Sequence, residues 1–210
     1  MTVFDDMTAF GVVPVITISD VRDALPLVDA LLAGGLPVAE ITFRTAAAPE
    51  AIEMISKHRP QMLVGAGTVL TEDQADVAKD AGAKFALSPG IDPVTLAHAA
   101  TKNLPFAPGI MTPSDIQIAL RAGCDLVKFF PAMTAGGLAA LKSIAGPYLH
   151  TGMRFNPTGG ISADTARTWL DYQPVAAVGG SWIATPKDIA NQEWEKISLA
   201  AADAIKRCPK

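Results

Sequence analysis

The sequence has few charged residues, few aromatic residues and only two cysteines. Charged residues make up 18% of the chain, whereas an average soluble domain has about 25%. With a net charge of −4, the chain lacks the extended basic face that nucleic-acid-binding domains carry. Aromatic residues make up 6%, too few for the stacking platforms that bind single-stranded nucleic acid. We therefore expect no nucleic-acid partner.

The sequence also lacks segments that would direct it to or across a membrane. No apolar run approaches the length of about 18 residues that a membrane-spanning helix needs. The first ten residues contain Asp5 and Asp6 and no basic residue, so we expect no signal peptide. Cys124 and Cys208 show no metal-ligand spacing, and so few cysteines are typical of a reduced cytoplasmic chain. We expect a cytoplasmic protein without a membrane partner.

Short β-rich runs alternate with Ala-rich helical patterns along the whole chain. The centres of these runs lie about 23 residues apart, which leaves room for one strand, one helix and two short loops. The expected strands are Val12–Ile18, Val38–Phe43, Leu63–Thr68, Phe85–Ser88, Phe106–Pro108, Leu126–Phe130, Arg154–Pro157 and Val175–Val178.

Capping residues mark the ends of the helices between these strands. Thr71, Asp92, Thr112 and Ser162 each precede a helical pattern and are favourable N-caps. Ala-Gly pairs are typical of left-handed helix C-caps and end three helices, at Ala33-Gly34, Ala81-Gly82 and Ala122-Gly123.

Strict alternation of strand and helix predicts a parallel sheet. Eight such units without a long insert predict an α/β chain with a single (β/α)8 TIM-barrel domain over residues 1–210. Short extra helices are expected within Val3–Phe10 and Ala184–Ala204. An open doubly wound sheet is the alternative, but it would carry a G-x-G-x-x-G turn after its first strand. The segment Ile16–Asp20 contains no glycine.

Lys128 is an ionisable residue inside an otherwise apolar expected strand. Alternation places Lys128 and Phe130 on one face of the strand and Val127 and Phe129 on the other. If the two latter residues pack beneath the helices, Lys128 points into the barrel. Burial disfavours the charged amine, and a neutral amine is what Schiff-base chemistry on a ketone requires. The alternative is a structural lysine paired with a carboxylate.

Glu40, Thr42 and Arg44 form a polar face on the second expected strand. Glu40 in this position would serve as a general base, and the Arg44 guanidinium would hold a carboxylate through two hydrogen bonds. A buried ion pair that only fixes the strand register is the alternative for Glu40.

Glycine pairs follow the last two expected strands, at Gly159-Gly160 and Gly179-Gly180. Barrel enzymes often bind phosphate there through exposed backbone N–H groups, although a glycine pair is also an ordinary turn. Small residues end two earlier strands, at Gly65–Thr68 and Ser88–Gly90. They would leave room in a pocket, with tight turns as the alternative.

The histidines do not indicate a metal site. His58, His98 and His150 all lie away from the carboxyl ends of the expected strands, and none has a carboxylate or histidine at metal-ligand spacing. We interpret them as solvated surface residues and expect no metal.

Seven short motifs carry a specific resemblance. They are Val12–Ile16, Glu40–Thr45, Val64–Leu70, Ser88–Gly90, Lys128–Ala132, Pro157–Ser162 and Gly179–Trp182. In this order the chain resembles the aldolases of 2-keto-3-deoxy-6-phosphogluconate (KDPG), which are class I aldolases of the Entner–Doudoroff pathway. Members often also cleave 4-hydroxy-2-oxoglutarate. The resemblance implies a lyase, usually a homotrimer, that needs no cofactor.

The resemblance also implies roles for residues at the matching positions. Lys128 would form the Schiff base with the ketone carbon of the substrate. Glu40 would move protons, through water, during carbinolamine formation and carbon–carbon cleavage. Arg44 and Thr68 would hold the pyruvate carboxylate.

Further matching positions would hold the remainder of the substrate. Phe130 would pack against the pyruvyl group, Pro89 would line the pocket, and Thr158 would lie near the substrate hydroxyls. The residues expected to bind phosphate are Gly159, Gly160, Gly179, Gly180 and Ser181. Asn156, two residues before Thr158, is a position at which we expect variation.

The resemblance implies cleavage of KDPG to pyruvate and glyceraldehyde 3-phosphate. It also implies that the Glu-x-Thr-x-Arg pattern at Glu40–Arg44 favours the gluconate substrate over its galactonate epimer. A barrel isomerase or epimerase acting on a sugar phosphate would use the same phosphate site but would not need Lys128. A non-catalytic sensor of a phosphorylated ligand is a third class, in which replacement of Lys128 would leave binding intact.

Overall fold

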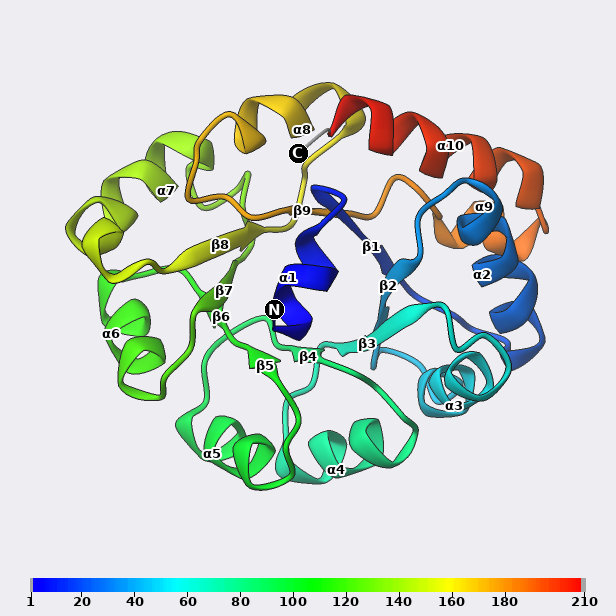
Figure 1. Cartoon of the computed structure of the whole chain (residues 1–210), viewed down its shortest axis with the longest axis horizontal. Helices are drawn as coiled ribbons and strands as arrows, with labels where there is room; N and C mark the ends of the chain where they lie inside the picture. The colour runs from blue at the N-terminus through cyan, green and yellow to red at the C-terminus, as the bar shows by residue number, and fades with distance from the viewer. Residues whose placement is uncertain (1, 209–210) are drawn as a thin grey trace.

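The computed structural model describes residues 2–208. Its strands lie around the middle of the molecule and its helices surround them (Figure 1). The strands are β1 (Val12–Ile16), β2 (Val38–Thr42), β3 (Leu63–Gly67), β4 (Ala86–Leu87), β5 (Phe106–Ala107), β6 (Gly109–Ile110), β7 (Leu126–Phe129), β8 (Arg154–Pro157) and β9 (Val178–Gly180).

Helices follow the strands in alternation, as the sequence predicts. They are α1 (Val3–Thr8), α2 (Ala24–Ala33), α3 (Ala48–His58), α4 (Glu72–Asp80), α5 (Pro93–Thr101), α6 (Pro113–Arg121), α7 (Gly137–Ala145), α8 (Ala163–Leu170), α9 (Pro186–Ala190) and α10 (Trp194–Arg207). Two short 3-10 helices, Val21–Asp23 and Gly146–Thr151, precede α2 and follow α7.

The strands form parallel sheets. A curled six-stranded sheet has the order β5-β4-β3-β2-β1-β9, and a three-stranded sheet has the order β6-β7-β8. Strands β1, β2 and β3 are buried along almost their whole length, as expected for strands covered on both faces. The predicted α/β class with parallel strands is therefore confirmed.

The two sheets approach each other at two places. Pro108 alone separates β5, which pairs with β4, from β6, which pairs with β7. A proline has no backbone N–H to donate to a ladder, so the single strand expected here is divided. After β8, Thr158 forms an isolated parallel bridge with Gly179 of β9.

The predicted N-caps are confirmed at α4, α5 and α6. The side chains of Thr71, Asp92 and Thr112 each accept a hydrogen bond from a backbone N–H in the first turn of their helix. These bonds satisfy N–H groups that have no partner within the helix.

Two local predictions were wrong. The last strand is Val178–Gly180 rather than Val175–Val178, because Val175 forms only an isolated bridge with Phe155. The left-handed residue after α2 is Gly35, with φ of 80°, whereas Gly34 remains right-handed.

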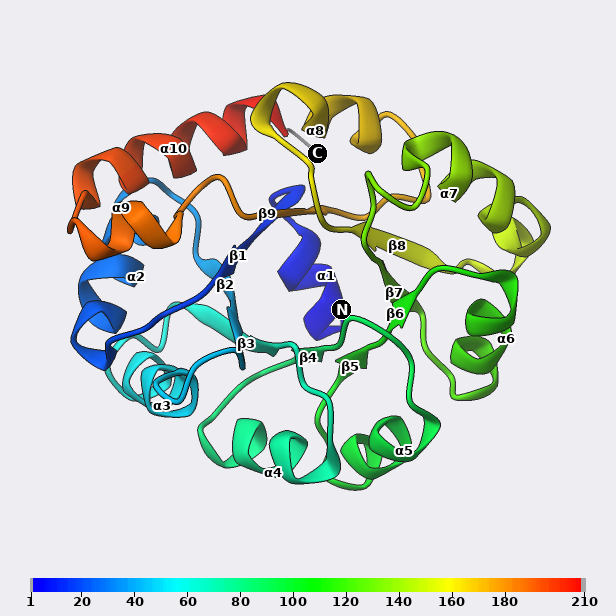
Figure 2. The ribbon, with the colours of Figure 1, turned by 180° about the vertical axis from the view of Figure 1, so that it is seen from behind.

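Helix α1 covers the end of the molecule at which the strands begin, and Figure 2 shows it among the strands from behind. Its Asp5 forms an ion pair of 2.8 Å with Arg154 at the start of β8, and Arg154 also pairs with Asp125. These ion pairs give Arg154, an ionisable residue at a strand start, a structural role. Met7 of α1 is fully buried. No helix within residues 2–208 has both the length and the apolar character needed to span a membrane.

Candidate active site

Lys128 and Glu40 form an ion pair in the interior of the molecule. The Lys128 Nζ lies 2.8 Å from Glu40 Oε1, and the side chains are 5% and 0% exposed. The sequence leaves open whether Lys128 is a nucleophile or is paired with a carboxylate, and the structure shows such a pair. The two interpretations are compatible, because a base beside an amine can take its proton and so activate it.

The pair joins the two sheets. Glu40 lies in the middle of β2, where its Cα is in register with Val15 of β1 and Gly65 of β3. Lys128 lies on β7, between Gly109 of β6 and Asn156 of β8. A direct contact between Lys128 and Glu40 therefore requires both side chains to point to the space that the strands surround.

Glycine at position 67 is required by the position of the Glu40 carboxylate. A Cβ atom on Gly67 would lie 2.1 Å from Glu40 Oε1, far inside van der Waals contact. The Phe85 ring occupies the corresponding space beside Gly65. The prediction that these glycines leave room in a pocket was therefore wrong, since Glu40 and Phe85 fill that space.

Phe130 lies directly after β7, which ends at Phe129 rather than at Phe130 as expected, and its ring is on the side of Lys128, as the alternation predicts. The Lys128 Nζ is 5.7 Å from the centroid of the Phe130 ring, within the range of a cation–π contact. The ring therefore provides an apolar wall beside the amine.

Arg44 and Thr68 lie just beyond the carboxyl ends of β2 and β3. Arg44 is outside the strand to which it was assigned, and its side chain is exposed and has no ion-pair partner within residues 2–208. Thr68 has φ of 58°, a left-handed conformation that is uncommon for a non-glycine residue. Such backbone strain is often found at ligand-binding positions.

The two glycine pairs differ in their surroundings. Gly159 and Gly160 follow β8 with φ of 105° and 77°, so both need the conformational freedom of glycine. Gly179 and Gly180 lie within β9 rather than after it, which corrects their assignment to a loop. A Cβ atom on Gly179 would lie 2.2 Å from the Oγ1 atom of the buried Thr158.

Ser181 and Pro89 lie at other strand ends. Ser181 follows β9 and is exposed. Pro89 follows β4 and lines a cavity of about 270 Å³ together with Leu70, Ile91 and Thr95. Lys128 is not among the residues that line this cavity.

Asn156, for which the sequence predicts variation and no role, is a buried polar residue. It is 0% exposed and is in register with Lys128 on the neighbouring strand. Its position within an expected strand was the available signal, because an uncharged polar residue stands out there as an ionisable one does.

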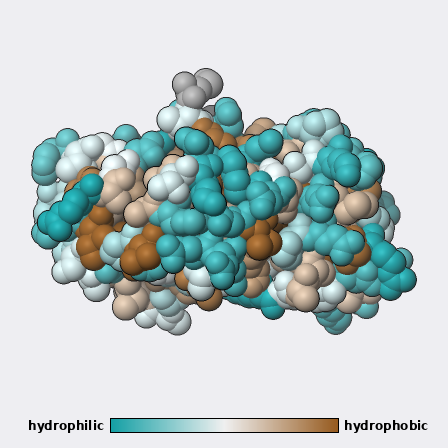
Figure 3. All heavy atoms as spheres, turned by 90° about the horizontal axis from the view of Figure 1, so that it is seen from below, coloured by the Kyte–Doolittle hydropathy of each residue, from teal (hydrophilic) through white to brown (hydrophobic). Residues whose placement is uncertain are grey.

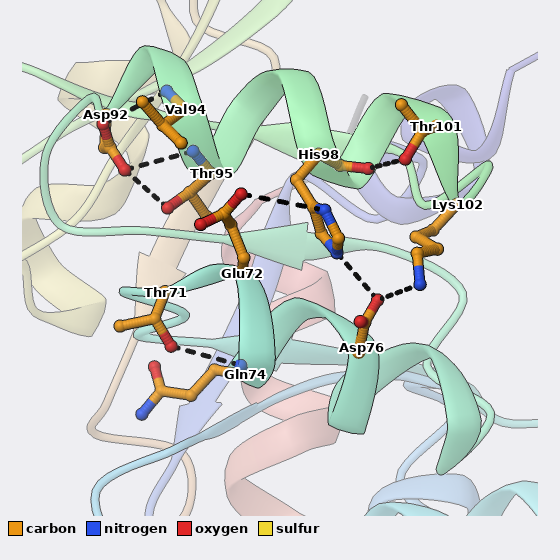
Figure 4. A network of polar contacts seen from close by, with 10 residues as sticks. All are labelled: Thr71, Glu72, Gln74, Asp76, Asp92, Val94, Thr95, His98, Thr101 and Lys102. Atoms are coloured by element: carbon orange, nitrogen blue, oxygen red, sulfur yellow. Dashed lines mark hydrogen bonds and ion pairs between the residues drawn. The ribbon is translucent and has the colours of Figure 1, made fainter.

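One histidine does not fit the prediction of solvated surface residues. The His98 side chain on α5 is 24% exposed, and its Nε2 lies 2.9 Å from Asp76 Oδ1 of α4, which also contacts Lys102 (Figure 4). The hydrogen bond from Lys102, then that from His98, lowers the pKa of the Asp76 carboxyl. Within residues 2–208, no three His, Cys, Asp or Glu side chains are grouped so that they could hold a metal ion.

Comparison with known proteins gives consistent matches over the whole chain. A family model described as KDPG and KHG aldolase matches residues 3–200. A 2-dehydro-3-deoxy-phosphogluconate aldolase of Haemophilus influenzae is 39% identical over 203 residues, which cover 97% of this chain and 95% of that protein. A KHG/KDPG aldolase of Escherichia coli is 40% identical over 199 residues, which cover 95% of this chain and 92% of that protein.

Solved structures give the same result. A KDPG aldolase from Legionella pneumophila, with pyruvate captured as a covalent carbinolamine intermediate, has a TM-score of 0.91 and 39% identity. The match covers 96% of this chain and 97% of that one. A 2-keto-3-deoxy-6-phospho-gluconate aldolase from Zymomonas mobilis has a TM-score of 0.87 and 41% identity, with 96% and 95% of the two chains covered.

Proposed function

The chain belongs to the family of KDPG and KHG aldolases, which makes it a lyase, and from this premise we propose that it cleaves KDPG to pyruvate and glyceraldehyde 3-phosphate through a Schiff base on Lys128. The observation that carries this proposal is the buried contact of 2.8 Å between the Lys128 amine and the Glu40 carboxylate. The contact supplies a nucleophile and a base in one apolar environment.

Each step of the reaction uses this pair. Glu40 takes a proton from the Lys128 amine, whose nitrogen attacks C2 of the substrate, and the carbonyl electron pair moves to oxygen. The oxygen takes a proton from the attacking nitrogen to give a carbinolamine. Glu40 returns its proton to the carbinolamine hydroxyl, which leaves as water and gives a protonated imine, an electron sink. Removal of the C4 hydroxyl proton by Glu40, through water, breaks the C3–C4 bond and releases the aldehyde. The remaining enamine is protonated at C3, and hydrolysis of the imine releases pyruvate and restores Lys128.

The other residues would hold the substrate. Arg44, exposed beyond β2, is the cation for the carboxylate, and Thr68 lies at the adjacent strand end. Phe130 would contact the pyruvyl group, Pro89 would line the entrance, and Thr158 would contact the hydroxyls. The phosphate would bind to backbone N–H groups of Gly159, Gly160, Gly179, Gly180 and Ser181.

Reductive trapping tests this proposal. Borohydride added with pyruvate should reduce the imine and add a stable mass to one peptide, that containing Lys128. Lys128→Ala should prevent trapping and abolish pyruvate release from KDPG. The exposed Lys84 provides the matched control, and Lys84→Ala should behave as the wild type. An adduct on another lysine, or none with the wild type, would contradict the mechanism.

The same site supports cleavage of 4-hydroxy-2-oxoglutarate to pyruvate and glyoxylate. The reaction at C2, C3 and C4 is unchanged, and only the phosphate contacts are missing. The Escherichia coli relative carries both substrates in its name. Comparison of kcat/KM for KDPG, its galactonate epimer and 4-hydroxy-2-oxoglutarate would rank them. We expect KDPG to be first. Only the two phosphorylated substrates use the glycine pairs, and the Glu-x-Thr-x-Arg pattern at Glu40–Arg44 favours the gluconate substrate over its epimer.

We propose that the two sheets together form one closed (β/α)8 barrel in a single domain. Two observations support this proposal. Only Pro108 divides β5 from β6, and the bridge between Thr158 and Gly179 connects the ends of β8 and β9. From the low cysteine count of the sequence, we also propose a cytoplasmic location.

We also propose a homotrimer. Leu70, Val94 and Met111 precede or begin α4, α5 and α6 and are 51%, 59% and 51% exposed. On the side that carries α4 and α5, separate hydrophobic groups interrupt a mostly hydrophilic surface (Figure 3). Val94→Asp should shift the mass measured by light scattering from that of a trimer to that of a monomer. Leu199→Asp, at a 66% exposed position on α10, is the control. If Val94→Asp remains a trimer, the proposal that this surface forms the trimer interface is contradicted.

A further inference from the structure

Unpartnered polar atoms in the interior are concentrated at the reactive lysine. Within residues 2–208, three buried side-chain polar atoms have no hydrogen-bond partner: Glu40 Oε2, Asn156 Nδ2 and Asn156 Oδ1. Glu40 contacts Lys128 directly, and Asn156 is its register partner on the adjacent strand. Both residues are 0% exposed.

The Asn156 amide points to the same side of the sheet as the Lys128 amine. Residues in direct register on parallel neighbouring strands share a face, and Lys128 reaches Glu40 on the inner face. The amide offers two N–H donors and one carbonyl acceptor. The amide therefore lies on the inner face, on the strand beside Lys128.

An unsatisfied buried amide is costly. Each buried polar atom without a partner lowers the stability of the fold, and an apolar residue of similar volume would avoid that loss. Thr8 and Thr95 are also buried, but each donates its hydroxyl hydrogen to a protein oxygen. Asn156 is therefore suited to a partner that binds and leaves during the reaction.

We propose that Asn156 is a further catalytic residue, which donates a hydrogen bond from Nδ2 to the oxygen on C2 of the substrate. The proposal rests on the proposed function. As the Lys128 nitrogen attacks C2, the carbonyl electron pair moves to this oxygen, which the amide N–H stabilises. The oxygen then takes a proton from the attacking Lys128 nitrogen, and the carbinolamine hydroxyl accepts from Asn156 Nδ2 and donates to Glu40 Oε2. Glu40 returns to this hydroxyl the proton that it took from Lys128, the oxygen leaves as water, and Asn156 is not consumed.

The expected effect falls on imine formation. Removal of one donor to a developing oxyanion lowers the rate by about 10²- to 10³-fold. Asn156→Leu should therefore slow the formation of the trapped pyruvate adduct, measured by quenching with borohydride at successive times, by about that factor. Its thermal midpoint should be unchanged or raised, because an apolar side chain replaces unsatisfied polar atoms. If the Asn156 amide is only structural, the opposite is expected: Asn156→Leu has a lower thermal midpoint and the wild-type trapping rate.

A second variant and a control complete the experiment. Asn156→Ser keeps one small donor and should retain a trapping rate between those of the wild type and Asn156→Leu, and it decides the question if the leucine variant does not fold. Thr8→Val, which removes a partnered buried hydroxyl on α1, should trap at the normal rate. A wild type without an adduct would refute the proposed function itself. If the wild type forms the adduct normally and both Asn156 variants form it at the wild-type rate, this inference alone is overturned.

Discussion

Replacement of Lys128 by methionine should destabilise the fold as well as abolish the reaction. The Glu40 carboxylate is 0% exposed and lies 2.8 Å from the Lys128 amine. Methionine has a similar length and fills most of the same space, but it leaves the carboxylate buried without a charge partner. Removal of one partner of a buried pair costs about 3–5 kcal/mol.

Urea unfolding at pH 7 measures this cost. With a slope of about 3 kcal/mol per M, which is typical of the larger single domains, the midpoint should fall by about 1–1.7 M. The double variant Glu40→Gln/Lys128→Met removes both charges and should recover most of the loss. Lys84→Met, at an exposed position, should change the free energy of unfolding by less than about 0.5 kcal/mol.

The double variant provides the critical comparison. Strong coupling between the two substitutions is expected because the side chains are in contact. A Lys128→Met variant with the wild-type midpoint would refute the reasoning, since the carboxylate would then carry no buried, paired charge. A double variant destabilised by the sum of the two single effects would refute it as well.

Further predictions concern packing, pH and thiol reactivity. Gly179→Ala should lower the free energy of unfolding by about 1–3 kcal/mol through overpacking and should reduce kcat/KM for KDPG. Gly146→Ala, with open space around its Cβ position, should change neither, and equal urea midpoints for the two variants would contradict this prediction. The pKa of Asp76 is lowered chiefly by the hydrogen bond from Lys102 (Figure 4). Asp76→Asn should therefore be less stable than the wild type at pH 7, and this difference in stability should disappear as the pH falls below 3.8 and the wild-type carboxylate is protonated. A stability difference that does not depend on pH would refute this prediction. Burial raises the pKa of the Cys124 thiol from 9.0 to about 11. At pH 8, iodoacetamide should therefore alkylate Cys124 about 100-fold more slowly in the folded protein than in urea. Equal alkylation rates would contradict this prediction.

Local signals in the sequence predicted most of the fold. Alternating apolar runs located the strands, and Thr71, Asp92 and Thr112 marked helix starts because capping acts within one turn. The division of β5 from β6 was missed, since Pro108 was placed at a strand end. The position of β9 was missed because its glycines resemble a turn, whereas their pairing with β1 depends on residues far away in the sequence.

The charges of the site could be predicted, but its contacts could not. Lys128 and Glu40 stood out because ionisable residues are rare inside buried strands. Their mutual contact joins residues 88 positions apart, and no local pattern records such a distance. For the same reason, the occupation of the space beside Gly67 by Glu40 could not be inferred from the small residues alone.

The contact between α1 and β8 has a consequence for synthesis of the chain on the ribosome. Asp5 and Arg154 lie 149 positions apart, so at about 5–20 residues per second roughly 7–30 s pass before both have been made. The β1 strand waits longer still for its partner β9. During that interval a hydrophobic strand edge is open to pairing with other chains. Nascent chains should therefore depend on chaperones until the last strand emerges.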